Sequence, residues 1–178
     1  MYKPASINVT PSRRPALGFL ALILVQGFHE TEHIVQIVQR FVLHNPTGAG
    51  ILGSWLDIEP VHLAYNAAFL GLIALCFWVG GYGRDLAQHR PAVLGLMLFA
   101  LFFEAYHFVE HIIKMAQFIE TGKNGTPGIL GHFVNLVWLH FTYNTIAYIP
   151  LMIVFVIDGY YQTTISIFSK RFPFVSAN

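Results

Sequence analysis

The sequence predicts an all-α integral membrane protein, a four-helix bundle built from two copies of a helical hairpin. Two observations predict this fold. More than half of the 178 residues are hydrophobic and only 11% are charged, a balance typical of membrane proteins. A polar motif also recurs along the chain, because His29 and His33 are repeated 78 positions later as His107 and His111.

Four apolar segments are each long enough to cross a bilayer, which takes roughly 20 helical residues. We expect the spans to cover residues 15–43, 59–79, 91–119 and 134–157, followed by a polar and aromatic tail. Pro15 suits the first turn of the first helix. Turn-forming residues separate the segments. Residues 1–178 therefore read as a single four-span domain.

The basic residues are distributed unevenly between the two sides of such a protein. Four spans place both termini on one side, together with the middle loop. That side holds Lys3, Arg13, Arg14, Arg84, Arg90, Lys170 and Arg171. The other side holds Arg40, Lys114 and Lys123. The positive-inside rule therefore predicts cytoplasmic termini.

The duplication extends over two whole hairpins, residues 14–83 and 90–161. The segment Gly-Ile-Leu-Gly occurs at residues 50–53 and again at residues 128–131. His-Leu-Ala-Tyr-Asn at residues 62–66 likewise matches His-Phe-Thr-Tyr-Asn at residues 140–144. Because each copy contains two spans, both copies have the same orientation. A pseudo-twofold axis along the membrane normal is the expected relation between them.

Ionisable side chains within the spans are energetically costly, so they indicate a functional site. A helix turns about 100° per residue, which places His29, Glu32 and His33 on one face of the first span. His62 and His140 begin the following spans at a similar depth. The expected metal ligands are His29, Glu32, His33, His62, His107, Glu110, His111 and His140. The residues expected to support them are Asn66, Asn144, Tyr65, Tyr143, Gln26 and Glu104.

Imidazole and carboxylate ligands together suit iron, copper, zinc or manganese. Helix bundles with such ligands commonly hold two ions, so we expect a dinuclear non-haem centre in the outer, periplasmic or exterior half of the bilayer. The corresponding activity is a metal-dependent oxidoreductase acting on a small apolar or lipid-soluble substrate. We expect the protein to contact membrane lipid. Other membrane subunits, or further copies of the same chain, are the alternatives for a protein partner. The net charge of +1 gives no indication of nucleic-acid binding.

Three other interpretations remain open. Two histidines on facing helices could clamp haem b in an accessory or electron-transfer subunit. Residues 29–33 also fit His-Glu-x-x-His, and both copies fit His-x-x-Glu-His, which are metalloprotease patterns. The second copy has Phe108 where the first has Glu30, which argues against the former pattern. Finally, the histidines could serve only as hydrogen-bonding groups between helices.

Overall fold

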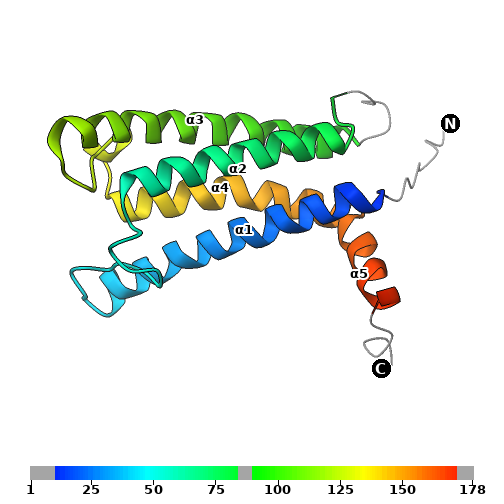
Figure 1. The fold of residues 1–178 in the computed structure, drawn as a ribbon, viewed down its shortest axis with the longest axis horizontal. Helices are drawn as coiled ribbons and strands as arrows, with labels where there is room; N and C mark the ends of the chain where they lie inside the picture. The colour runs from blue at the N-terminus through cyan, green and yellow to red at the C-terminus, as the bar shows by residue number, and fades with distance from the viewer. Residues whose placement is uncertain (1–10, 84–89, 172–178) are drawn as a thin grey trace.

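The computed structural model describes residues 11–83 and 90–171, and every regular element in these ranges is helical (Figure 1). The elements are α1 (Arg13–Ile37), the π-helical turn η1 (Val38–Val42), α2 (Glu59–Val79), α3 (Pro91–Thr121), the 3-10 turn η3 (Leu130–His132), α4 (Leu136–Ile157) and α5 (Tyr160–Arg171). The all-helical prediction is confirmed.

The four longer helices lie lengthwise beside one another, and α5 turns away from them (Figure 1). α1 packs against α2 and α4, and α3 packs against the same two helices. α5 contacts both α1 and α4. This arrangement brings the two halves of the chain into contact along their length.

Three of the helices, α2, α3 and α4, are long and apolar enough to cross a membrane. α1 has a similar length but carries more polar residues. The surface of these helices is rich in apolar side chains, as is expected of a protein that faces lipid. Leu24 on α1 and Phe102 on α3 are 62% and 70% exposed, whereas the neighbouring His29 and His107 are buried. Apolar side chains therefore face outward while polar ones are buried between the helices.

An apolar core fills the end of the helices at which the chain begins. Phe19, Leu22, Ile73, Met97 and Leu151 are buried in it. This core accounts for the uninterrupted apolar runs in the first half of α1 and the second half of α2. It separates the polar residues further along α1 from the end of the molecule where α5 lies.

Tyr82 and Tyr160, which are 78 positions apart in the sequence and each follow a glycine, close this core. Tyr160 stacks on Phe19 with ring centroids 4.2 Å apart. Tyr82 donates a hydrogen bond to Asp158, and its hydroxyl lies 3.1 Å from that of Tyr160. Burial raises the pKa of Tyr82 and of Tyr160 above its usual value, so both hydroxyls stay protonated and able to donate.

The structure differs from the expected elements in two places. The first helix changes to π-helical geometry after Ile37, and both forms together end at Val42. The expected tail after residue 157 instead contains α5, which covers twelve residues. Residues 1–10, most of the middle loop and the last seven residues lie outside the described part of the chain, so the expectations for them stay untested by the structure.

Candidate functional site

Six histidines from four helices come together near one end of the helices. They are His29 and His33 on α1, His62 on α2, His107 and His111 on α3, and His140 on α4. Across helices, the ring centroids of His111 and His140 are 5.3 Å apart, and those of His33 and His140 are 5.9 Å apart. We call these six residues the histidine cluster. The sequence-based expectation that they lie together agrees with this geometry.

The helices α1 and α3 each contribute a close pair of imidazoles. The Nε2 atoms of His29 and His33 are 3.2 Å apart, and the Nε2 atoms of His107 and His111 are also 3.2 Å apart. Residues four apart on a helix lie on the same face, which allows this approach. Two nitrogen ligands about 2.1 Å from one tetrahedral ion are roughly 3.4 Å from each other. The spacing of each pair is therefore close to that of two ligands of one ion.

The other ring nitrogens of two histidines face hydrogen-bond acceptors. His33 Nδ1 lies 2.8 Å from Gln36 Oε1, and His107 Nδ1 lies 3.3 Å from Glu104 Oε2. An imidazole that donates from Nδ1 to such an acceptor keeps its lone pair on Nε2. When these rings donate from Nδ1, their Nε2 atoms are free to bind a metal ion.

His111 has an ionic neighbour that the sequence motifs did not indicate. Its Nδ1 lies 3.8 Å from Glu59 Oε2, and the other oxygen of Glu59 is 3.0 Å from Lys114 Nζ. Lys114 also donates to the carbonyl of Thr126 at 2.6 Å. The position equivalent to Glu59 in the second copy is Val137, so the duplication gave no signal for it. The two halves of the cluster thus differ in their charged surroundings.

Both ring nitrogens of His62 lie near oxygen atoms of residues that precede it by four or five positions in the chain. Its Nδ1 lies 3.1 Å from the carbonyl oxygen of Ile58, and its Nε2 lies 3.4 Å from Asp57 Oδ1. Its ring nevertheless stacks near that of His111, with centroids 5.8 Å apart. His140 differs from it, because its Nε2 is buried without a hydrogen-bond partner among the described residues. Of these two histidines, His140 therefore has the Nε2 atom that is more available to bind a metal ion.

The two glutamates expected among the metal ligands, Glu32 and Glu110, bind the loop backbone. Each accepts hydrogen bonds from two consecutive amides of the loop that follows its helix. The bonds run from Ile51 and Leu52 to Glu32 at 2.9 and 3.1 Å, and from Ile129 and Leu130 to Glu110 at 2.8 and 3.0 Å. Both oxygens of Glu32 are used in this way, whereas Glu110 uses only Oε1. Both carboxylates therefore anchor the loops that follow their helices.

Repeated glutamines and glycines complete the same loop contact. Gln39 exchanges hydrogen bonds of 2.8 and 3.1 Å with the backbone of Gly50, and Gln117 does the same with Gly128 at 2.8 and 3.2 Å. Gly50 and Gly128 have φ angles of 73° and 65°, which favour glycine. A Cβ atom at either glycine would collide with the carboxylate of Glu32 or Glu110. The repeated Gly-Ile-Leu-Gly segment thus has a structural explanation.

The asparagines bind backbone rather than imidazole. Asn66 Nδ2 donates to the carbonyl of His62 at 2.8 Å, and Asn144 Nδ2 donates to that of His140 at 2.9 Å. Asn144 Oδ1 also accepts a 2.8 Å hydrogen bond from Gln26 Nε2, which joins α4 to α1. These residues support the segments that carry the histidines.

Aromatic rings lie against one histidine of each pair. Tyr65 stacks on His29 with centroids 4.0 Å apart, and the centroids of Tyr143 and His107 are 4.8 Å apart. The Tyr65 hydroxyl donates to the carbonyl of Val25 at 2.9 Å. Both tyrosines therefore lie in the supporting positions that the sequence predicts.

Glu30 lies outside the histidine cluster. Its Oε1 accepts a 2.5 Å hydrogen bond from Thr145 Oγ1 on α4. Its other oxygen is buried without a hydrogen-bond partner among the described residues. Glu30 therefore contributes to the contact between α1 and α4.

Beside the histidine cluster, two glutamates of α3 each have one buried oxygen that lacks a hydrogen bond. Glu104 Oε1 and Glu110 Oε2 are such oxygens within the described part of the chain. No group of three or more His, Cys, Asp or Glu side chains among the described residues is already arranged to hold a metal ion. Comparison of the chain with protein-family models, with curated proteins and with solved structures gives no match.

Proposed function

We propose that the histidine cluster binds transition-metal ions within a four-span membrane protein. The observation that carries this proposal is the 3.2 Å separation of the Nε2 atoms in both helical pairs. Each pair would provide two ligands to one ion, so the protein would hold two ions. His140, whose Nε2 has no hydrogen-bond partner among the described residues, is the best placed additional ligand.

The membrane arrangement that accompanies this proposal is a four-helix bundle with α1 as the fourth span. α1 covers 25 residues, enough to cross the hydrocarbon layer, and residues 16–25 are apolar. The contacts of Gln39 with Gly50 recur between Gln117 and Gly128, which supports two hairpins related by a pseudo-twofold axis. The excess of basic residues near the termini supports a cytoplasmic location for both ends and an outer location for the cluster.

The ligand set narrows the choice of metal. Because Glu32 and Glu110 bind loop amides, imidazole nitrogen is the main ligand type in the cluster. Imidazole suits copper, zinc and iron, whereas manganese prefers carboxylate and other oxygen ligands. We therefore favour copper, zinc or iron.

The proposed reaction is an oxidation or reduction of a small apolar or lipid-soluble molecule. The apolar core beneath the cluster, which includes Phe19 and Leu22, is packed closed and provides no polar path through the protein. A substrate would therefore arrive from the lipid or from the outer face. Copper or iron would supply the electron-transfer step; the cluster residues would position the ion and exclude bulk water.

Haem b is the main alternative cofactor, in an accessory or electron-transfer subunit. Axial imidazoles bind haem iron from opposite faces of the porphyrin, whereas the two Nε2 atoms of each helical pair are only 3.2 Å apart on one face of a helix. The geometry of these pairs favours small ions over a macrocycle. A metalloprotease is disfavoured for another reason: both candidate carboxylates, Glu30 and Glu32, bind other partners.

Elemental analysis and an absorption spectrum of the same purified sample distinguish these proposals. We expect copper, zinc or iron at about two ions per chain and no Soret band. A Soret band with one iron per chain would favour haem. Absence of metal after loading with each ion in turn would leave the histidines with a purely structural role.

A further inference from the structure

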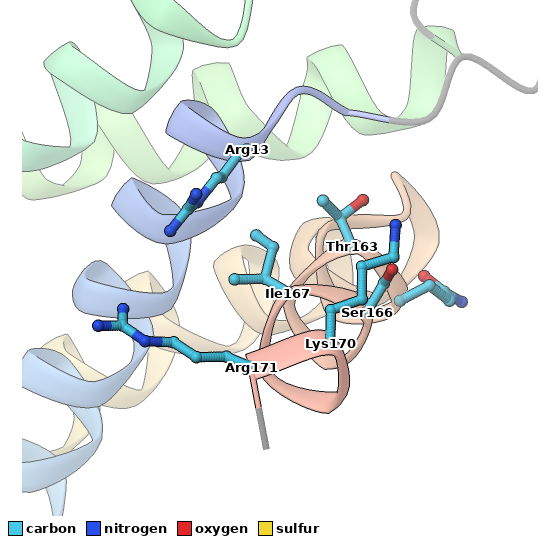
Figure 2. Close-up of a pocket in the computed structure, with 7 residues that line it drawn as sticks. Arg13, Thr163, Ser166, Ile167, Lys170 and Arg171 are labelled. Carbon is cyan, nitrogen blue, oxygen red and sulfur yellow. The ribbon is translucent and has the colours of Figure 1, made fainter. Parts of the chain in front are cut away.

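A second polar feature lies at the opposite end of α1 from the histidine cluster. There the start of α1 and one side of α5 enclose a pocket of about 770 Å³ (Figure 2). α5 leaves the direction of the other helices at this point (Figure 1). Nothing in the proposed metal chemistry uses this pocket.

The pocket is lined by cations and contains no acidic side chain among its described lining residues. The cations are Arg13 from α1 and Lys170 and Arg171 from α5. Figure 2 shows Arg13 and Arg171 on one side of Ile167, with Ser166 and Lys170 on the other. Positive charge from two helices, together with the hydroxyl of Ser166, provides donors for an anionic group such as a phosphate.

The pocket-facing side of α5 is matched by an apolar side. Thr163, Ser166, Ile167 and Lys170 line the pocket and follow one another at helical spacing. Tyr161, Ile165 and Phe168 share the other side and are 45–48% exposed. A short helix with one basic side and one exposed apolar side is typical of segments that lie in the membrane interface.

The position of the pocket favours a lipid over a soluble anion. Arg13 is the first residue of α1, and the apolar run of that helix begins at Ala16, one turn later. Val156 and Ile157, at the matching end of α4, are exposed apolar residues that could contact an acyl chain. A phospholipid places a phosphate and apolar chains at this boundary together, whereas free phosphate offers only the charge.

We infer that this pocket binds the phosphate headgroup of an anionic phospholipid in the cytoplasmic leaflet. The bound headgroup would lie between Arg13 on α1 and Arg171 on α5, which share one side of Ile167, and would so fix α5 against the spans. This inference rests on the membrane placement proposed above but not on the metal centre. A failure of metal binding would leave it unaffected.

Native mass spectrometry of the full-length protein in detergent tests the inference. Phosphatidylglycerol and phosphatidylcholine serve as the anionic and zwitterionic probes. We expect preferential retention of phosphatidylglycerol by the wild-type protein. Each cation near an anionic lipid contributes about five-fold in affinity, so Arg13→Gln/Arg171→Gln should weaken phosphatidylglycerol binding roughly 25-fold.

The matched control is Arg14→Gln/Arg90→Gln, which removes the same charge at the same end without touching the pocket lining. Its lipid preference should equal that of the wild-type protein. Equal losses in both double variants would show general charge attraction and overturn the inference. So would equal binding of the two lipids by the wild type, or displacement of the lipid by millimolar inorganic phosphate.

Discussion

The Nε2 atoms of His107 and His111 lie 3.2 Å apart while His107 Nδ1 faces Glu104 at 3.3 Å. If His107 donates from Nδ1, its Nε2 carries a lone pair and can only accept. The contact between the two imidazoles is then either one hydrogen bond donated by His111 or a shared metal ion. His29 and His33 pose the same choice, since His33 Nδ1 faces Gln36. A metal centre and a purely structural cluster should respond differently to substitution of these residues.

Loss of the acceptor at Glu104 should weaken metal binding without removing a ligand. Substitution of a group that orients a metal-binding histidine typically costs about 10–100-fold in metal affinity. We expect a loss of this size in Glu104→Leu, and recovery of most of it in Glu104→Gln, whose amide oxygen can still accept from His107. Chelator competition with zinc or copper measures the affinity.

Glu30→Leu is the control for this series, because it also removes a buried carboxylate but one bound to Thr145. Its metal affinity should match that of the wild type. If Glu104→Gln binds metal as weakly as Glu104→Leu, the carboxylate charge and not the acceptor position is what matters, and the orienting role is wrong.

The loop anchors predict unequal effects of equivalent substitutions. Glu32 uses both oxygens, so Glu32→Gln loses one of its two amide hydrogen bonds, whereas Glu110→Gln can keep both on its single carbonyl oxygen. A hydrogen bond to a charged group contributes about 1.5–3 kcal/mol. We therefore expect Glu32→Gln to lower the melting temperature in detergent more than Glu110→Gln.

Metal content of the same two variants provides the second readout. Both should retain their ions, because neither carboxylate is a ligand in this account. Complete loss of metal from the folded Glu110→Gln protein would restore the carboxylate to the ligand set and contradict the loop-anchor role.

Glycine substitutions test the fit between each loop and its carboxylate. Gly50→Ala and Gly128→Ala place a methyl group against Glu32 and Glu110 and also strain the backbone. Gly125→Ala shares the positive φ, at 71°, but meets no atom within 4 Å. The control should cost about 1–2 kcal/mol from backbone strain. The other two should cost clearly more in thermal unfolding; equal effects in all three would remove the collision as a cause.

The sequence predicted the helices well because apolar runs and turn residues mark their ends. It also predicted which faces point inward, since His29 and His33 repeat at helical spacing. It could not predict the partner of Glu32, because helical periodicity says nothing about how a loop folds back. The amides of Ile51 and Leu52 reach Glu32 from 19 and 20 residues away.

Two further features were missed for different reasons. Glu59 has no equivalent in the second half of the chain, so the duplication gave no indication of its role. α5 did leave a signal: Tyr161, Ile165 and Phe168 alternate at helical spacing with the polar Thr163, Ser166 and Lys170. Because the segment has a low overall hydrophobicity, it was predicted to be a polar and aromatic tail. Its amphipathic spacing is nevertheless typical of a helix in the membrane interface.

The ratio of metal to protein in single-histidine variants tests the central proposal most directly. His33→Ala and His111→Ala each remove one member of a pair, and His132→Ala removes an exposed histidine outside the cluster. We expect about two ions per chain in the wild type and in His132→Ala, and about one in each of the other variants. An unchanged metal content in His33→Ala and His111→Ala, or no metal in the fully loaded wild type, would contradict the account.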